Sequence, residues 1–328
     1  MKRRSLLLAL ATLPIAAWAG KVVYPQVTPG RRFAFPRDDG AHPGLRTEWW
    51  YVTGWLGDTK GFQVTFFRAR PEEESANPSS FNPRQILLAH AALADPDRGR
   101  LVHDERAARA GLGLAGAERE RTRVWIDDWA LEQEGGRFRA RIPARDFDFD
   151  LSFTAPGDPV LQGDHGFSRK GRRPHEASYY YSRPQLAVSG KVDRKDVRGT
   201  AWLDHEWSSA YLAPEAEGWD WTGINLLDGR SMMAFQMRGK DGSIHYSPPG
   251  VSMKALRWWQ SPRTGVRYPV SMEVNGLRLE PLMDDQELDA RASTGTIYWE
   301  GAVRAFAGDR EVGRGYLELT GYWKPMKL

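Results

Sequence analysis

The chain contains no cysteine in 328 residues. This absence excludes disulfide bonds, thiol nucleophiles and thiolate metal sites, although it is compatible with an oxidising compartment. The excess of positive charge is also small. The formal net charge is +4, and Lys2, Arg3 and Arg4 supply three of these charges, which leaves +1 for the rest of the chain. No basic stripe interleaves with aromatic residues, so we expect no nucleic-acid partner.

Several catalytic motifs are missing as well. The sequence has no G-x-S-x-G elbow, no glycine-rich phosphate loop and no H-E-x-x-H zinc motif, since His175-Glu176 and His205-Glu206 each lack the second histidine. A zinc site built from His90, His175 and His205 has no supporting local spacing. We therefore expect neither a metal nor another cofactor.

The N-terminus has the pattern of an export signal. Basic residues 2–4 precede an apolar run at residues 6–17, and Ala17-Trp18-Ala19 is a small-residue cleavage site, which places the cut after Ala19. Arg3-Arg4 also loosely resembles a twin-arginine signal. We expect a signal peptide at 1–19, an N-terminal extension at 20–47, and a location in the periplasm or outside the cell. We expect no stable membrane span after cleavage, with retention as an uncleaved anchor left open.

Helical periodicity is nearly absent, and apolar and polar residues alternate instead. Trp, Tyr and Phe number 14, 11 and 13, and such aromatic wealth with many glycines and prolines is typical of β-sheet with tight turns. We predict an all-β fold of short antiparallel strands, with short helical pieces near residues 104–109 and 284–290. The clearest predicted strands are residues 61–67, 147–153, 185–189 and 315–320.

An internal repeat divides the sequence. Residues 50–56 resemble residues 220–226, and the predicted strands at 199–204 and 313–318 also match. The repeat predicts two antiparallel β-barrels in tandem, packed together. Their expected bounds are 48–208 for the first domain, 209–217 for a linker and 218–328 for the second domain.

Strand alternation places the residues around His205 on two faces. Overlaying the repeat points His205 and Trp207 into the first barrel, and His205 then occupies the position that Leu319 has in the second. Burying an imidazole without a partner costs about 2 kcal/mol, so a compensating contact is expected. One interpretation is a ligand-facing histidine, and the other is a structural histidine bonded to a backbone carbonyl.

Asp204 and Glu206 point to the outer face of the same strand. Their counterparts in the second domain, Glu318 and Thr320, have the pattern of ordinary solvent-facing residues. We therefore expect the outer pair to matter only if the second barrel covers it, in which case burial raises the pKa values of both carboxyl groups.

Two further segments hold candidates for a ligand site. His175 precedes a run in which Tyr179 and Tyr181 share a face, and these residues either line an aromatic pocket or are half-exposed on a sheet. His90 follows an apolar run and is expected to point inward or to lie at the rim. His42 lies near a predicted turn, and we assign it no role.

Glu48 begins the first predicted strand beside Trp50 and two other large aromatic residues. Its carboxylate is expected either to be partly desolvated there or to form a salt bridge with Arg46 or another arginine.

Three motifs resemble the lipocalin-like family that contains carotenoid 1,2-hydratase and exported AttH-like proteins described as predicted secreted hydrolases. They are Glu48-Trp49-Trp50-Tyr51, His175-Glu176 with the following tyrosines, and Trp202-Leu203-Asp204-His205-Glu206-Trp207. The resemblance covers nearly all of the chain after the signal, and it implies two lipocalin-like barrels and a large apolar ligand. In the hydratases a His and a Trp two residues apart look important, and His205 and Trp207 match them. The hydratases also use a Tyr and an Asp on a later strand, which residues 231–237 lack.

Two functions follow as hypotheses. The first is an enzyme that hydrates or hydrolyses an isoprenoid or lipid-like substrate, using acid–base groups. The second is a non-catalytic exported protein that carries a lipid, with membrane-transport components as possible partners. A structural or carbohydrate-surface protein with exposed aromatics is a third, weaker reading. The expected acid–base groups are His205, Asp204, Glu206 and Glu48, and the expected pocket walls are Trp207, Trp221, Tyr179, Tyr181, Trp50, His175 and His90.

Overall fold

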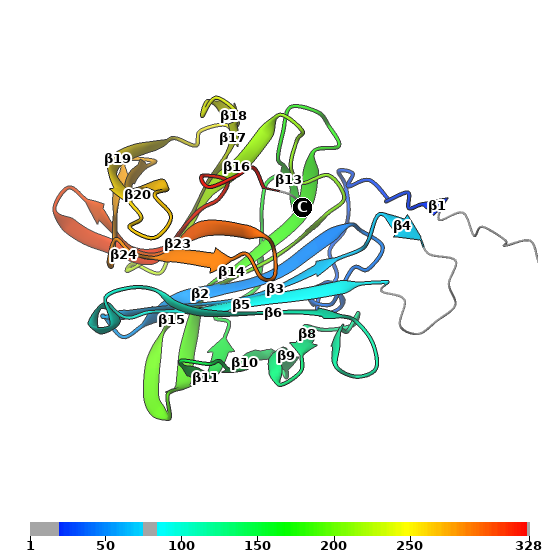
Figure 1. The fold of residues 1–328 in the computed structure, drawn as a ribbon, viewed down its shortest axis with the longest axis horizontal. Coiled ribbons are helices and arrows are strands. Elements are labelled where there is room, and N and C mark those ends of the chain that lie inside the picture. Colours follow the sequence, from blue (N-terminus) through cyan, green and yellow to red (C-terminus); the bar gives the residue numbers. More distant parts are fainter. Residues whose placement is uncertain (1–19, 75–83, 327–328) are drawn as a thin grey trace, which may run out of the picture.

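The computed structural model describes residues 20–74 and 84–326, and the predicted signal peptide lies outside these ranges. The regular secondary structure of the described chain is almost entirely β-strand, as predicted (Figure 1). Its helical content is two 3-10 turns, η1 (Arg37–Asp39) and η2 (Pro96–Arg98). No helix in the described part of the chain has the length and apolarity needed to cross a membrane.

The first large sheet is antiparallel and curls into a nearly closed barrel. Arg106, at one end of the sheet, donates to the carbonyl oxygen of Ile126 near the other end. In spatial order its strands are β6 (Val102–Arg109), β5 (Ile86–Ala94), β3 (Lys60–Ala69), β2 (Thr47–Leu56), β15 (Lys195–Ser208), β14 (Ala177–Val192), β11 (Asp148–Thr154), β10 (Arg137–Pro143), β9 (Trp129–Glu134), β8 (Arg123–Ile126) and β7 (Ala115–Ala117). The short strands β12 (Val160–Leu161) and β13 (Phe167–Arg169) pair with β14.

The second large sheet forms a curled half-barrel, and a small pair of strands lies apart from both sheets. In spatial order the second sheet contains β18 (Ile244–Tyr246), β17 (Ser231–Gly239), β16 (Ala216–Leu226), β24 (Arg310–Leu319), β23 (Thr296–Ala307), β21 (Leu277–Pro281), β20 (Arg267–Val274) and β19 (Met253–Gln260). Strand β22 (Glu287–Ala290) pairs with β23, and β1 (Gly20–Lys21) pairs with β4 (Glu73–Glu74). The chain passes from the first sheet to the second between Ser208 and Ala216.

The repeat seen in the sequence recurs in the topology. In the first sheet the order β3-β2-β15-β14 matches β17-β16-β24-β23 in the second. The predicted helices at 104–109 and 284–290 are wrong, because residues 104–109 lie in β6 and residues 287–290 form β22. Pairing with a neighbouring strand outweighs the helix propensity of the Asp-, Glu- and Arg-rich sequences there.

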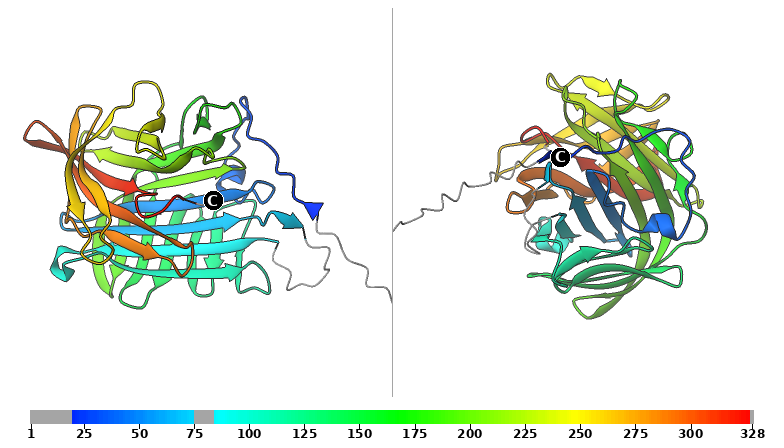
Figure 2. Two further views of the ribbon diagram at one scale, coloured as in Figure 1. Left: turned by 45° about the horizontal axis from the view of Figure 1, so that its top comes forward. Right: turned by 90° about the vertical axis from the view of Figure 1, so that its right-hand side faces the viewer.

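Both faces of the central strands β2 and β15 are buried. Trp50 and Trp207 face the core of the first barrel, whereas Tyr51 and Trp202 face the second sheet. Figures 1 and 2 show the second sheet, coloured yellow to red, packed over the blue and green strands of the first. Burying a large apolar side chain contributes about 1.5–3 kcal/mol, so this double burial explains why the sequence is rich in aromatics.

Candidate functional site

Two groups of buried polar residues lie back to back across β2 and β15. The first, which we call the barrel cluster, fills the mouth of the first barrel and contains His42, Glu48 and His205. The second surrounds a cavity of about 340 Å³ between the two sheets, which we call the interface cavity. Asp204, Glu206 and Glu318 line this cavity together with many apolar and aromatic side chains, and Glu48 of the barrel cluster also belongs to its lining, next to Arg68.

Asp204 lies on the outer face of β15, where the second sheet covers it, and it is only 3% exposed. Its carboxylate accepts hydrogen bonds from Tyr180 Oη at 2.6 Å, Ser182 Oγ at 2.5 Å and Trp202 Nε1 at 2.6 Å. Burial raises the pKa of Asp204 to about 7, although these hydrogen bonds oppose the rise. Trp221 Nε1 in turn donates to Tyr180 Oη at 3.0 Å, which links the two sheets.

Glu206 lies two residues further along the same face and is also buried. It accepts hydrogen bonds from the hydroxyl of Ser178 and from Lys170 Nζ, the latter at 2.7 Å. Lys170 is 1% exposed and lies over the rings of Phe235 and Tyr180, 4.0 and 4.7 Å from their centroids. Burial raises the pKa of Glu206 and lowers the pKa of Lys170, in each case against the attraction of the ion pair.

Glu318 faces the same cavity from β24 of the second sheet, and its expected place on a solvent face is wrong. Trp219 Nε1 donates to its Oε2 at 2.8 Å. Burial raises the pKa of Glu318 to about 7, and the negative charges of Asp204 and Glu206 raise it further. Thr320 was likewise expected to face solvent but is 1% exposed, because the outer face of this strand packs against the first barrel.

Glu300 lies directly opposite Glu318 on the neighbouring strand and is fully buried. Tyr51 Oη donates to its Oε1 at 2.5 Å. Burial holds the pKa of Glu300 well above its usual value, and the nearby charge of Glu318 adds to the effect. Two carboxyl groups in this cross-strand position therefore do not both ionise near neutral pH.

His90 lines the cavity from β5 of the first sheet, and its imidazole contacts the hydroxyl of Tyr298 in the second sheet. Its Nδ1 lies 2.8 Å from Tyr298 Oη, and its Nε2 lies 2.9 Å from Ser293 Oγ. Burial lowers the pKa of His90 to about 3, so the imidazole is neutral at physiological pH.

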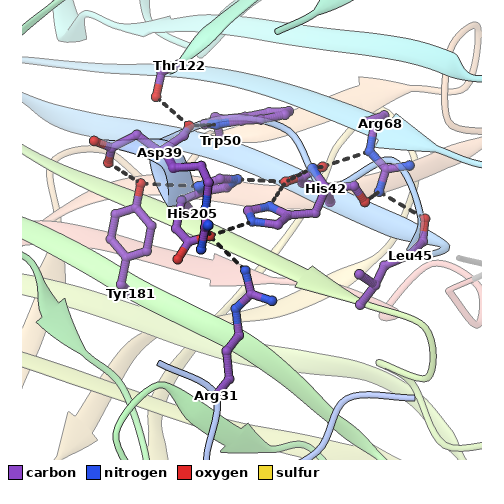
Figure 3. A network of polar contacts seen from close by, with 12 residues as sticks. Arg31, Asp39, His42, Leu45, Trp50, Arg68, Thr122, Tyr181 and His205 are labelled. Atoms are coloured by element: carbon purple, nitrogen blue, oxygen red, sulfur yellow. Dashed lines mark hydrogen bonds and ion pairs between the residues drawn. The ribbon is translucent and has the colours of Figure 1, made fainter. Parts of the chain in front are cut away.

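The barrel cluster holds His205, which strand alternation pointed inward (Figure 3), and Trp207 is buried beside it. His205 is 0% exposed, with Nε2 at 2.9 Å from Glu48 Oε1 and Nδ1 at 3.1 Å from Tyr181 Oη. Its ring stacks on Trp50 with centroids 4.7 Å apart, and the ring of Trp207 stacks on His42 at 3.8 Å. None of these rings lines the interface cavity.

The titration behaviour of the barrel cluster follows its ion pairs. Arg68 Nε donates to Glu48 Oε2 at 2.7 Å, so the partner of Glu48 is Arg68 and not Arg46. Burial acts to raise the pKa of Glu48, but Arg68 and the histidines hold it well below the usual value. Burial lowers the pKa of His205, whereas the carboxylates beside His42 outweigh burial and raise the pKa of that residue.

The remaining candidate residues lie in different parts of the structure. Trp221 lines the interface cavity, and Tyr181 belongs to the barrel cluster. Tyr179 packs in the core of the first barrel, where its hydroxyl accepts a hydrogen bond from the backbone N–H of Thr28. His175 is exposed in a turn and joins neither group.

Sequence reasoning did not identify four residues around the cavity, namely Glu318, Lys170, Tyr180 and Trp219. The repeat aligns Asp204 with Glu318, but alternation alone gives Glu318 the pattern of a solvent-facing residue. Lys170 lies outside the repeated segments, and no pattern in the sequence marks it.

Comparisons with known proteins agree with this architecture. The AttH-like family profile matches residues 26–322. The crystal structure of an AttH protein from Nitrosomonas europaea has 46% sequence identity and a TM-score of 0.83, covering 91% of this chain and 99% of that one. Kievitone hydratase from Nectria haematococca has the same fold at 12% identity, with a TM-score of 0.60 and coverage of 93% and 98%. No curated protein matches the sequence significantly. The chain belongs to the AttH-like family, and its fold is a tandem of lipocalin-like barrels.

Proposed function

We propose that the interface cavity binds a compact apolar molecule and that its carboxyl groups catalyse a proton transfer, with hydration of a carbon–carbon double bond as the reaction class. One observation carries this proposal. Asp204 and Glu318 come from two different sheets, face the same largely apolar cavity, and both have pKa values raised to about 7. Such carboxyl groups exchange protons near neutral pH, as general acids and bases must.

The hydrogen bonds assign different roles to the two carboxyl groups. Ser182 Oγ accepts from Gln162 Nε2 and Tyr180 Oη accepts from Trp221 Nε1, so both hydroxyl hydrogens point at Asp204. Asp204 is thereby held as a proton acceptor. Glu318 receives one hydrogen bond, from Trp219, and its other oxygen has no protein partner among the described residues, so it is free to carry a proton.

Hydration then proceeds in two steps. Glu318 donates its proton to one carbon of the double bond, and the positive charge develops on the other carbon. The faces of Trp219 and Trp221 stabilise this charge, at about 0.5–2 kcal/mol for each ring. Asp204 takes a proton from water as the water oxygen bonds to the cationic carbon, and proton exchange between the two carboxyl groups restores the starting state.

The fold relative from Nectria haematococca is named a hydratase, and this name supports the reaction class without identifying the substrate. A cavity of about 340 Å³ lies at the small end of the range for ligand pockets, which favours a compact isoprenoid or lipid-like substrate over the large ligand that the family resemblance implies. We also propose that the protein acts after export, on the basis of the signal-like residues 1–19.

The apolar wall of the cavity favours a second candidate, a non-catalytic carrier that delivers a lipid to a membrane-transport system. Phe67, Leu88 and Met326 are among the apolar residues that line the cavity. A carrier needs this wall but does not need Glu318 to titrate.

The two candidates are separated by measuring binding and turnover in the same variants. Native mass spectrometry of gently purified protein identifies the retained molecule, and incorporation of ¹⁸O from labelled water then measures its hydration. For an enzyme, Glu318→Gln and Asp204→Asn retain the molecule and lose turnover, whereas the exposed control Glu134→Gln keeps both. Retention of a molecule that the wild type never converts supports the carrier, and failure to retain any apolar molecule contradicts both candidates.

A further inference from the structure

Three atoms with lone pairs converge in the barrel cluster. His42 Nδ1 lies 2.8 Å and His205 Nε2 lies 2.9 Å from the same oxygen, Glu48 Oε1. The three atoms all lie within 4.8 Å of one another. They come from three separate segments, which is why sequence spacing predicts no site here.

The outer nitrogen of His42 is a hydrogen-bond donor. His42 Nε2 lies 3.2 Å from Asp38 Oδ1. That carboxylate also accepts from Arg31 Nη2 at 2.7 Å and from the backbone N–H of Ala34 at 2.6 Å, so it acts as an acceptor throughout. The hydrogen between His42 and Asp38 therefore belongs to His42 Nε2.

The outer nitrogen of His205 is a donor for a related reason. His205 Nδ1 lies 3.1 Å from Tyr181 Oη. The hydroxyl of Tyr181 donates its hydrogen to Asp39 Oδ1 at 2.6 Å, and a phenol has only one hydrogen to give. His205 Nδ1 must therefore donate to Tyr181, and a neutral His205 then points a lone pair from Nε2 at Glu48.

These assignments leave three acceptors facing one another. Glu48 is a carboxylate whose second oxygen accepts from Arg68 Nε at 2.7 Å and from the backbone N–H of His42 at 2.9 Å, and each imidazole, when it is neutral, turns a lone pair toward the first oxygen. Contacts of 2.8 and 2.9 Å between acceptors require positive charge between them. Either each imidazole takes a second proton, or one divalent cation occupies the centre, and the total charge is the same in both cases.

We propose that His42 Nδ1, Glu48 Oε1 and His205 Nε2 bind one divalent transition-metal ion. Two imidazoles and one carboxylate are a ligand set that Zn²⁺ and Fe²⁺ take in proteins. Metal bonds of about 2.1 Å place donor atoms about 3 Å apart in octahedral geometry and about 3.4 Å apart in tetrahedral geometry, so the contacts of 2.8 and 2.9 Å widen slightly when the ion binds. The carboxylate of Asp38 and the phenol of Tyr181 bond the outer imidazole nitrogens, as partners of metal-binding histidines do.

The surroundings hold the ligands rigidly. The ring of His42 lies parallel to Trp207 within 5°, and the ring of His205 stacks on Trp50. Glu48 and His205 are 0% exposed. The ion joins the segment before β2, strand β2 itself and β15, and so it fastens the N-terminal segment into the mouth of the barrel.

The test uses the full chain carrying an affinity tag without histidine. The protein is stripped with EDTA and titrated with Zn²⁺ or Co²⁺, and the bound metal is measured by mass spectrometry and by the visible absorption of Co²⁺. We expect one equivalent per chain and a higher Tm on loading. His42→Gln and His205→Gln weaken binding by roughly 100-fold or more, whereas His90→Gln, which alters an equally buried histidine elsewhere, leaves it unchanged.

A second measurement keeps the proposal testable if the histidine variants do not fold. Nitrogen-15 spectra of histidine in the wild-type protein distinguish a metal-bound imidazole from a doubly protonated one. Resonances of His42 and His205 that shift on addition of Cd²⁺ or Zn²⁺ support the site. Two imidazolium rings that persist in excess metal, together with no uptake of Zn²⁺ or Co²⁺, overturn the proposal and show that protons hold the cluster together.

Discussion

Replacing Glu318 by glutamine is expected to stabilise the protein at neutral and alkaline pH. The carboxyl group of Glu318 has a pKa raised from 4.5 to about 7 because it is buried beside Asp204 and Glu206. Each pKa unit corresponds to about 1.4 kcal/mol, so this rise corresponds to about 3 kcal/mol of folding free energy. Glutamine keeps an oxygen for Trp219 Nε1 and carries no titratable proton.

The sign of the effect follows from where the proton is held. Below pH 4.5 Glu318 is protonated in both the folded and the unfolded chain, so ionisation has no effect on stability. Between pH 4.5 and about 7 the unfolded chain releases the proton while the folded chain keeps it, and stability falls as the pH rises. Above about pH 7 the loss is complete. The difference between variant and wild type is therefore small at pH 4.5 and reaches about 3 kcal/mol at pH 8.

Urea unfolding followed by tryptophan fluorescence at the two pH values measures this difference. Glu134→Gln serves as the control, because Glu134 is exposed and its loss should leave the pH profile unchanged. Parallel profiles for the wild type and Glu318→Gln would refute the argument, since they would show that Glu318 titrates alike in the folded and unfolded chains. A carboxyl group that weakens the fold at neutral pH is explained by function more readily than by stability.

Three further substitutions test the roles of Asp204, Lys170 and His205. Asp204→Asn should lower kcat by roughly 10²–10⁴ with ligand retention unchanged, measured by ¹⁸O incorporation and native mass spectrometry, because it removes the base but keeps the cavity. Lys170→Met should destabilise the fold by about 3–5 kcal/mol in urea unfolding, since it leaves Glu206 buried without its cation, and a second change of Glu206→Leu should restore most of the loss. His205→Gln should cost about 1–3 kcal/mol of stability and leave ligand retention unchanged, because His205 lies outside the cavity; loss of the retained ligand would contradict this placement.

Alternation and the repeat were sufficient to predict much of the first barrel. A period of two along residues 199–208 is enough to point His205 and Trp207 inward and Asp204 and Glu206 outward, and the structure has this arrangement. The match between 50–56 and 220–226 was sufficient for the tandem arrangement, because each copy carries the same neighbouring strands. These features depend on local spacing alone.

The interface cavity depends on how two sheets pack, which local spacing does not determine. Glu318 alternates with apolar residues just as a solvent-facing residue does, and only the contact between the barrels converts its outer face into an interior one. The same packing buries Lys170 against aromatic rings, although a lysine in a loop-rich segment is ordinarily predicted to be exposed. The prediction of a helix at 104–109 was wrong for a similar reason. This segment pairs as a strand with β5, and the local spacing of its residues does not reveal that partner.

Strand β15 serves both polar groups, and this affects how variants of its residues are interpreted. His205 points into the barrel cluster while its neighbours Asp204 and Glu206 point into the interface cavity, so any change at His205 also disturbs the strand that positions the two carboxyl groups. Loss of turnover in His205→Gln is therefore not enough to assign His205 a chemical role. His42→Gln disturbs the same cluster from another segment. Equal losses in the two variants indicate an effect through the position of β15, whereas a loss confined to His205→Gln indicates that the imidazole itself takes part in the reaction.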